Sequence, residues 1–473
     1  MMRFAAIVLL LSPAHCFLGA NPKSSLKHET KDATQSFELK AESSGNEKVV
    51  VDKRAERRKI ISSEKYNRMG FKEEAEDVSS MMLEEFTSPF IKEFKATNNI
   101  IKKGDVTLKL AEKYGFCWGV ERAIAMSFQA RKHFPGSKMH ITNELIHNPG
   151  VNEKLTEMNI KLVPNEKGKK DFSDIQDGDV VILPAFGATL EEMKFLDSKD
   201  VKVVDTTCPW VSKVWTTVDK HTKNSFTTIM HGKYEHEETI ATSSFAETYI
   251  IVKNMKEAEY VIEYMLHGGN KDAFLNKFSK AISEGFDPDI HLDKVGLANQ
   301  TTMYKRETRE IGKAFEKALM EKFGPEKLTE HYIAYDTICD ATQERQDAIL
   351  ELIEDPEINM MLVVGGWDSS NTHHLAEISA DKGIPTFWVN RAACIKPDGS
   401  IDHKDPHSME EINTADFLPE GKLCMGVTSG ASTPDAYVEE AIENIFMLKE
   451  LRTAGKVKDI WSKGKEIRAR LKK

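Results

Sequence analysis

Three widely separated cysteines, Cys117, Cys208 and Cys339, occupy the same kind of position in the sequence. Each precedes a stretch with apolar residues at helical spacing. Each also follows a short run of β-forming residues: 106–110, 201–204 and 332–335. A thiol at such a strand-to-helix turn lies near a helix N-terminus, whose partial positive charge favours the thiolate. If the three turns meet in the fold, three thiolates can hold one metal centre.

The spacing of these cysteines argues against the common structural metal sites. No Cys-x-x-Cys pair is present, so zinc fingers and ribbons are disfavoured, and so is a four-cysteine ferredoxin. A [4Fe-4S] cubane held by three thiolates leaves one iron without a protein ligand, which can act as a Lewis acid. The alternative is three buried structural cysteines, but their shared context favours the cluster. Cys394 and Cys424 lack that context and have no assigned role.

Polar loops at the predicted strand ends supply the remaining candidates. They are residues 144–149, 231–239, 299–302, 365–371 and 428–434. The last two are Gly/Ser-rich turns that enter helices, where backbone N–H and hydroxyl groups can cradle phosphate, although neither matches a P-loop. Each loop alone is typical of a helix cap. Together, with two histidines and a carboxylate, they predict an anion pocket with a proton donor.

The elements that position these residues alternate between strand and helix from Val106 onward, which predicts a parallel α/β arrangement. With one cysteine each, three comparable lobes of about a hundred residues are expected. The predicted division of the chain is a signal peptide (1–16), a transit-peptide-like disordered segment (17–60), a helical extension (61–105), lobes at 106–205, 206–335 and 336–448, an insertion near 257–294 in the second lobe, and a basic tail (449–473).

Composition narrows the class of protein. The net charge of −10 argues against a dedicated nucleic-acid binder, and six cysteines in 473 residues do not make a disulfide scaffold. No apolar run approaches the roughly 18 residues of a membrane span, so no stable membrane insertion is expected. The basic tail is typical of a solvated amphipathic helix.

The N-terminus is typical of a targeting signal. A positive charge at Arg3 precedes a short apolar core, and Ala14-His-Cys-Phe17 resembles the cleavage site of bipartite plastid presequences. We therefore expect delivery to a plastid through an ER signal peptide followed by a transit peptide. An ordinary secreted protein with a disordered propeptide is the alternative.

Seven motifs stand in the order of a known family: 115–123, 205–211, 236–239, 300–302, 336–346, 369–371 and 430–434. From about 106 to about 448 the chain resembles the 4-hydroxy-3-methylbut-2-enyl diphosphate reductase (IspH/LytB) family in its plant and cyanobacterial form. The resemblance implies three α/β lobes in a pseudo-threefold, trefoil arrangement around a central [4Fe-4S] cluster. It also implies reductive dehydroxylation of the substrate to isopentenyl and dimethylallyl diphosphates, with a ferredoxin-type electron donor in the plastid stroma.

The resemblance also implies roles for individual residues. Cys117, Cys208 and Cys339 match the cluster ligands, Glu238 the proton donor, and Thr301 the residue that orients the substrate hydroxyl. The implied diphosphate pocket is formed by His147, His236, Thr302, Thr342, Ser369, Ser370, Asn371 and Ser432. Many bacterial members carry a further histidine where this chain has Phe186, so this pocket should have one imidazole fewer.

Two other classes of protein remain open. Another enzyme with an open-iron [4Fe-4S] cluster, such as a hydro-lyase or a quinolinate-synthase-like enzyme, also fits three cysteines around one cubane. A non-catalytic, metal-stabilised binding protein fits the cysteines but not the polar motifs. The sequence does not give the oligomeric state.

Overall fold

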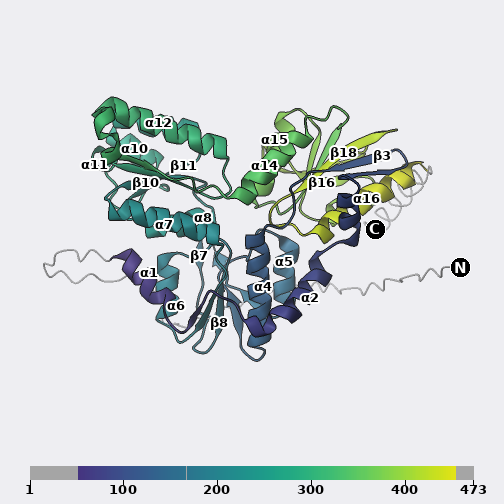
Figure 1. The fold of residues 1–473 in the computed structure, drawn as a ribbon, viewed down its shortest axis with the longest axis horizontal. Helices are drawn as coiled ribbons and strands as arrows, with labels where there is room; N and C mark the ends of the chain where they lie inside the picture. The colour runs from purple at the N-terminus through teal and green to yellow at the C-terminus, as the bar shows by residue number, and fades with distance from the viewer. Residues whose placement is uncertain (1–51, 167, 454–473) are drawn as a thin grey trace, which may run out of the picture. The chain divides into compact units, whose positions relative to one another are not determined.

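The computed structural model describes residues 52–166 and 168–453 (Figure 1). These residues form three β-sheets with helices packed against them, and a short ribbon of β6 (Asn165–Glu166) and β7 (Lys169–Lys170). Most strand pairs in the sheets are parallel, and antiparallel strands occur only toward the edges of the third sheet. The described chain is therefore an α/β protein with mixed sheets.

The first sheet is parallel throughout and is covered on both faces. Alternate residues of its central strand β8 pack into two different apolar clusters, one with helices α6 and α7 (Pro209–Lys223) and the other with α4 and α5. Its strands, in spatial order, are β1 (Tyr66–Asn67), β9 (Lys202–Asp205), β8 (Val180–Leu183), β4 (Met139–Ile141) and β5 (Ile160–Leu162). The helices of this region are α2 (Ala75–Phe86), α4 (Trp118–His133), α5 (Pro149–Glu157) and α6 (Leu190–Asp197). Helix α3 (Pro89–Ala96) packs instead against the third sheet, with Ile91 and Phe94 in its core.

The second sheet has four parallel strands, β11 (Tyr249–Val252), β10 (Thr227–His231), β12 (Val295–Asn299) and β13 (Tyr332–Ala334). The predicted insertion near 257–294 contains helices whose Phe274 and Phe278 are fully buried against this sheet. The helices are α7 (Pro209–Lys223), α8 (Glu237–Phe245), α9 (Met255–His267), α10 (Lys271–Lys277), α11 (Pro288–His291), α12 (Lys305–Phe323) and α13 (Leu328–His331).

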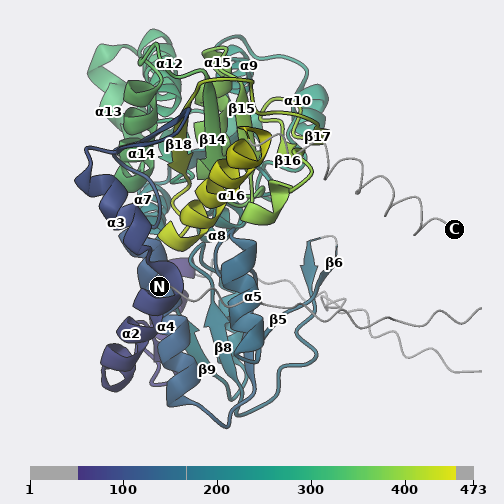
Figure 2. The same cartoon turned by 90° about the vertical axis from the view of Figure 1, so that its right-hand side faces the viewer.

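The third sheet is built from both ends of the described chain. Its order is β17 (Glu411–Thr414), β16 (Ile401–Lys404), β15 (Thr386–Val389), β14 (Met360–Val364), β18 (Leu423–Ser429), β3 (Val106–Leu110) and β2 (Ile100–Lys103). Its helices are α14 (Asp340–Leu352), α15 (Ser370–Asp381) and α16 (Asp435–Thr453), and Figure 2 shows α16 lying across the sheet. Short 3-10 turns occur at Lys72–Glu74, Pro325–Lys327 and Ala392–Cys394.

The prediction that the first lobe begins at Val106 is wrong. Strand β3 pairs in parallel with β18, as Figure 1 shows, and its buried residues Val106, Leu108 and Leu110 join the core of the third sheet. Alternation of apolar and polar residues identifies a strand and its buried face, but it does not specify which other strand will pair with it. The first strand of the predicted first lobe therefore completes the last sheet.

The N-terminal predictions need two corrections. Residues placed at the end of a disordered leader form helix α1 (Lys53–Ile61), capped by Asp52 and anchored by the buried Ile60. The segment expected to be a helical extension also contributes β1 to the first sheet and β2 to the third. Both strands are short edge strands, whose weak patterns are hard to recognise in sequence. The predicted signal peptide, the rest of the leader and the last twenty residues of the basic tail lie outside the described residues.

The three strands predicted before the cysteines, at 106–110, 201–204 and 332–335, are present within a residue or two. Among the helices that the structure describes, none is both long and apolar enough to cross a bilayer.

Candidate metal and anion site

The three cysteines occupy the predicted strand-to-helix turns. Cys117, Cys208 and Cys339 are the N-cap residues of α4, α7 and α14, and β3, β9 and β13 precede them. None of the three side chains makes a capping hydrogen bond, so the thiols are not committed to the helix ends. The predicted order of strand, cysteine and helix is confirmed at all three sites.

One cavity brings together every residue predicted for the site. Its lining includes the three cysteines and the ten other candidates: His147, His236, Glu238, Thr301, Thr302, Thr342, Ser369, Ser370, Asn371 and Ser432. These residues come from all three sheet regions and are separated by up to 315 positions in sequence. Cys394 and Cys424 do not line it, in keeping with their having no assigned role.

The turns that carry Cys117 and Cys208 pack closely against each other. Gly119 lies in the first turn of α4, and a Cβ atom there would lie 2.6 Å from Cys208 Sγ and 3.9 Å from Cys117 Sγ. Only glycine therefore allows the start of α4 to approach the thiol at the start of α7. The Cys339 turn is joined to the cavity by its backbone N–H, which donates to the carbonyl of Thr301 at 3.3 Å.

Burial works against free thiolates at this site. It raises the pKa of Cys208 to about 12 and that of Cys339 to about 11, and repulsion from Cys117 adds to both shifts. Backbone N–H groups at the starts of α7 and α14 lower these pKa values, but by less than burial raises them. The helix N-termini therefore favour the thiolates, as expected, but by less than burial disfavours them. A positively charged metal centre would favour the ionised thiols here, because metal binding stabilises thiolates.

The thiols are also spaced too widely for a single ion. Across residues 52–166 and 168–453, only one group of histidine, cysteine or acidic side chains has three ligand atoms all within 4.8 Å of one another, and it is His373, His374 and Glu377. Soft thiolate donors at wider spacing fit a multinuclear iron–sulfur centre better than one metal ion. The donor set therefore fits the expected cluster.

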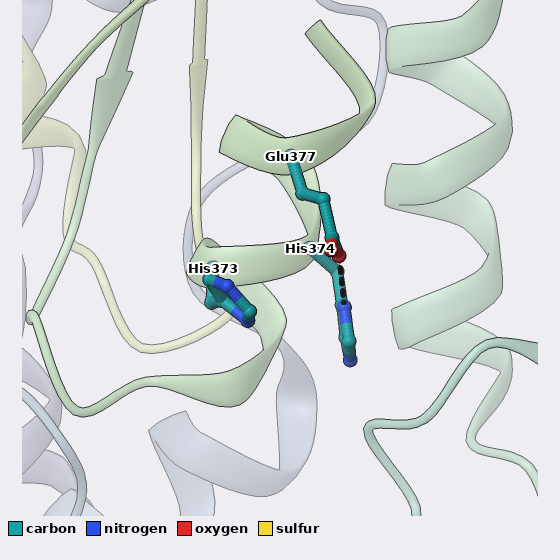
Figure 3. A group of neighbouring side chains, drawn as sticks. All are labelled: His373, His374 and Glu377. Carbon is teal, nitrogen blue, oxygen red and sulfur yellow. Dashed lines mark hydrogen bonds and ion pairs between the residues drawn. The ribbon is translucent and has the colours of Figure 1, made fainter. Parts of the chain in front are cut away.

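The His373–His374–Glu377 group, drawn in Figure 3, forms a hydrogen-bonded network. His374 Nδ1 lies 3.2 Å from Glu377 Oε2, which also accepts from the Tyr304 hydroxyl at 2.7 Å. His373 donates through Nε2 to the carbonyl of Pro406, and its Nδ1 faces the ammonium of Lys233 at 3.4 Å. The ammonium of Lys233 and the hydrogen bonds that His373 and Glu377 already make disfavour a cation here, so we assign the group to support of α15.

Glu238 is buried in the cavity with both carboxyl oxygens occupied. Its Oε1 accepts from the Thr301 N–H at 2.6 Å, and its Oε2 accepts from the Thr301 hydroxyl at 2.8 Å. Burial raises the pKa of Glu238 to about 7, although these hydrogen bonds favour the ionised form and oppose the rise. The carboxyl can therefore be protonated or ionised near neutral pH, as a proton donor requires.

Several polar groups that line the cavity have no hydrogen-bond partner within the protein. His147 Nε2, Ser370 Oγ and Asn371 Nδ2 are all buried and make no hydrogen bond. Asn371 is held in place because its Oδ1 accepts from the Ala431 N–H at 2.8 Å. Buried polar groups are rarely left unpaired in native proteins, so this set predicts a polar ligand. The N-terminus of the twelve-residue helix α15 adds a preference for an anion.

The two predicted histidines are oriented by their neighbours. His236 Nδ1 accepts from the Glu238 N–H at 3.1 Å, so a neutral ring carries its proton on Nε2. Burial keeps the pKa of His236 well below its ordinary value, and nearby His147 and Lys233 add to the effect. The ring nitrogens of His147 lie 3.2 Å from Glu144 Oε2 and 3.9 Å from Glu237 Oε2.

The other predicted pocket residues differ in whether their hydroxyl group is free to donate to a ligand. Thr302 Oγ1 accepts from the side chain of Gln300 at 2.7 Å, which leaves its hydroxyl hydrogen available. Ser432 instead donates to the carbonyl of His147 at 3.2 Å. Phe186 lines the cavity and stacks on His147, with ring centroids 4.3 Å apart, where many bacterial relatives were expected to place an imidazole.

Two supporting residues were missed by the sequence reasoning. Gln300 is fully buried and accepts from the Lys233 N–H and the Thr239 hydroxyl, which fixes the loop that carries Thr301. Arg345 is buried against the turn that carries Cys117. Both stand within the motifs used for the resemblance, so their position in those motifs was an available signal.

The fold and the site define an α/β protein with three thiols beside a pocket of unpaired polar groups. The model of the LytB protein family matches residues 108–446. A 4-hydroxy-3-methylbut-2-enyl diphosphate reductase of Nostoc sp. is 53% identical over 399 residues, which cover 84% of this chain and 98% of that protein. The protein of the same name from Thermosynechococcus vestitus is 52% identical over 403 residues, which cover 85% and 100%. The chain belongs to the LytB family.

A solved structure shares the fold. The E-1-hydroxy-2-methyl-but-2-enyl-4-diphosphate reductase from Plasmodium falciparum superposes with a TM-score of 0.53 at 23% sequence identity. The match covers 72% of this chain and 88% of that protein.

Proposed function

We propose that this protein reduces (E)-4-hydroxy-3-methylbut-2-enyl diphosphate to isopentenyl diphosphate and dimethylallyl diphosphate, the last step of the methylerythritol phosphate route. One observation carries the proposal: three thiols, a protonatable carboxyl and unpaired anion-binding groups line the same cavity. Relatives that carry the name of this activity match the chain at 52–53% identity over nearly their whole length.

The cofactor in this proposal is one [4Fe-4S] cluster held by Cys117, Cys208 and Cys339. When bound, it would supply electrons one at a time and an iron atom that can act as a Lewis acid. In the proposed fold, the three α/β lobes surround this centre in a pseudo-threefold arrangement, each contributing one ligand turn. The wide spacing of the thiols and their need for a positive partner support this assignment.

The proposed reaction breaks the allylic C4–O bond. Two electrons and two protons enter, the oxygen leaves as water, and a C–H bond forms on the allyl group. Hydroxide is a poor leaving group, so protonation of the oxygen is essential, and Glu238 is the group that the cavity offers for it. Thr301 holds the Glu238 carboxyl through two hydrogen bonds and lies next to the site for the substrate hydroxyl.

The diphosphate would bind at the opposite side of the same cavity. Ser370 and Asn371 provide unpaired donors, and His147, His236, Thr302, Thr342, Ser369 and Ser432 complete the proposed pocket. Binding energy from this remote charged group can hold the allylic alcohol against Glu238 without taking part in the chemistry. The buried setting strengthens each hydrogen bond and excludes water.

The cellular setting is proposed on separate grounds. The first relatives compared are cyanobacterial, and the N-terminal sequence is typical of a bipartite presequence, so we propose the plastid stroma as the working compartment. A ferredoxin-type protein is the proposed electron donor, because a one-electron carrier suits a one-electron centre.

An anaerobic EPR experiment tests the function. The protein is reconstituted with iron and sulfide, reduced, and measured alone, with the hydroxymethylbutenyl diphosphate, and with inorganic diphosphate as a control. We expect a reduced [4Fe-4S] signal that the full substrate shifts and inorganic diphosphate does not reproduce. Cys208→Ser should lose or destabilise the cluster.

Two results would contradict the proposal. A wild-type protein that forms no cluster would show that the thiols have another role. A cluster indifferent to the diphosphate, or product formation without a reductant, would instead point to the alternative class of open-iron enzymes, such as a hydro-lyase.

A further inference from the structure

Arg345 occupies an unusual position for a charged residue. It lies on α14, six residues after Cys339, and is only 5% exposed. Every hydrogen bond that its guanidinium donates goes to a backbone carbonyl: Gly115 at 2.6 and 3.1 Å, Phe116 at 3.1 Å, Tyr114 at 3.5 Å and Ala341 at 2.7 Å. The guanidinium therefore spans from the helix that follows Cys339 to the turn that precedes Cys117.

The conformation of the turn before Cys117 also depends on the glycine at position 115. Gly115 has a φ of 74°, in the left-handed region that favours glycine, and its N–H donates to Ser429 Oγ at 3.0 Å. Cys117 follows two residues later, and its N–H donates to the carbonyl of Ala431. With the Gly115 and Phe116 carbonyls fixed by Arg345, both sides of the Cys117 turn are restrained.

The positive charge of Arg345 is buried without a hydrogen-bonded carboxylate. Burial lowers the pKa of its guanidinium, and the negative groups that oppose this shift are, in order, Cys117, Cys339, Glu344 and Glu121. A buried charge whose donors all meet neutral carbonyls is costly unless an opposite charge lies close by. The two cysteines, as thiolates, are the main negative groups that can supply it.

We propose that Arg345 is a positioning residue for the metal centre: it ties the Cys117 and Cys339 turns together and stabilises the reduced, more negative form of the centre. This inference rests on the proposed function, because it requires the three cysteines to hold the cluster. Net charge and hydrogen bonding near the sulfurs are among the factors that set the potential of an iron–sulfur cluster. The charge of Arg345 therefore raises the reduction potential and eases acceptance of the first electron.

The test compares three variants of the anaerobically reconstituted full chain. Arg345→Gln removes the charge and keeps hydrogen-bonding capacity, whereas Arg345→Lys keeps the charge and loses the planar fork. Arg306→Gln is the matched control, because its side chain is 92% exposed on α12. For each variant, iron content, far-UV circular dichroism and the reduction potential from an EPR-monitored titration are measured.

We expect Arg345→Gln to weaken the equilibrium constant for one-electron reduction at least tenfold, which is a fall of about 59 mV in potential. Arg345→Lys should stay close to the wild-type potential while binding iron less completely, and Arg306→Gln should match wild type. An unchanged potential in a loaded Arg345→Gln protein would overturn the inference. So would a potential in Arg345→Lys that falls as far as that of Arg345→Gln, because the charge at this position would then not set the potential.

These outcomes are separable from a failure of the proposed function. Wild-type protein that forms no cluster contradicts the function itself, whatever the variants do. A wild-type cluster whose potential does not respond to the charge at position 345 contradicts only the role of Arg345.

Discussion

At the scale of single residues, Glu238 shows how one environment can tune a carboxyl for proton donation. Burial in the cavity raises its pKa, while two hydrogen bonds from Thr301 keep the rise moderate. A carboxyl that was buried but accepted no hydrogen bonds would stay protonated and donate poorly. A carboxyl that accepted both hydrogen bonds but was exposed would stay ionised. The balance gives an acid whose pKa of about 7 lets it hold or release a proton near neutral pH.

Replacing this carboxyl should remove most of the activity without preventing binding. Glu238→Gln keeps the size of the side chain but cannot deliver the acidic proton, so turnover should fall roughly 10²–10⁴-fold. The substrate should still shift the EPR signal, because the diphosphate contacts are intact. Glu235→Gln, an exposed carboxyl three residues earlier, is the control and should keep normal turnover. Normal turnover in Glu238→Gln would remove Glu238 from the mechanism.

The pKa of Glu238 also predicts how turnover depends on pH. A proton donor works only when protonated, so activity should be level below the Glu238 pKa of about 7 and decline above it. At higher pH the decline should approach roughly tenfold per pH unit. Measuring kcat between about pH 6 and 9 at saturating substrate checks this. A profile that is flat through this range would show that Glu238 does not limit turnover by its protonation.

At the scale of elements, the site depends on three helices starting at the right places. The first turns of α4, α7 and α14 each begin at a cysteine, and glycine at position 119 lets two of them approach closely. The helices need not be long or unusually stable to do this. What matters is that their N-termini converge, which is decided by the packing of their sheets.

Adding a methyl group at this contact should disturb the metal site. In Gly119→Ala the new Cβ would lie 2.6 Å from Cys208 Sγ, closer than non-bonded atoms can approach, so α4 or the thiol must move. We expect iron content after anaerobic reconstitution to fall at least about twofold, because ligand geometry supports the cluster. Gly136→Ala, where no atom lies within 4 Å of the new Cβ, should bind iron normally. Equal iron content in both variants would contradict this reading of the contact.

At the scale of the whole molecule, the N-terminal segment helps to hold regions together. Helix α1 lies against the second sheet's helices: Arg57 is 2.7 Å from Asp219 Oδ2, and its guanidinium is 4.8 Å from the ring of Phe245. Lys53 donates to the carbonyls of Ser244 and Ala246. On the other side, α1 contributes Ile60 to the core shared with the first sheet.

Breaking this contact should destabilise the folded protein. In Arg57→Ala, Asp219 loses its closest partner while its own side chain is only 8% exposed, and removing one partner of a buried pair costs about 3 kcal/mol. Urea unfolding followed by circular dichroism should report a loss of this order in the free energy of unfolding. Arg58→Ala, at the exposed neighbouring position, should change it little. Equal stability of the two variants would show that the α1 contact is dispensable.

The sequence by itself determined the local chemistry of this protein. Strand, cysteine and helix follow one another within about a dozen residues, and periods of 2 and 3.6 report such local structure directly. All thirteen candidate residues line one cavity, because loops that follow parallel strands gather at the carboxyl edges of the sheets. Their motifs, read together, identified the family.

The tertiary structure alone decided which segments pair and how charges are balanced. Strand β3 joins the last sheet, and α1 packs where a disordered leader was expected, because periodicity reports a buried face but not the partner that buries it. The pKa values of Cys208 and Glu238 rise through burial, which depends on atoms distant in sequence. Arg345 acquires its place between two ligand turns for the same reason: its contacts reach across some 230 residues to Gly115.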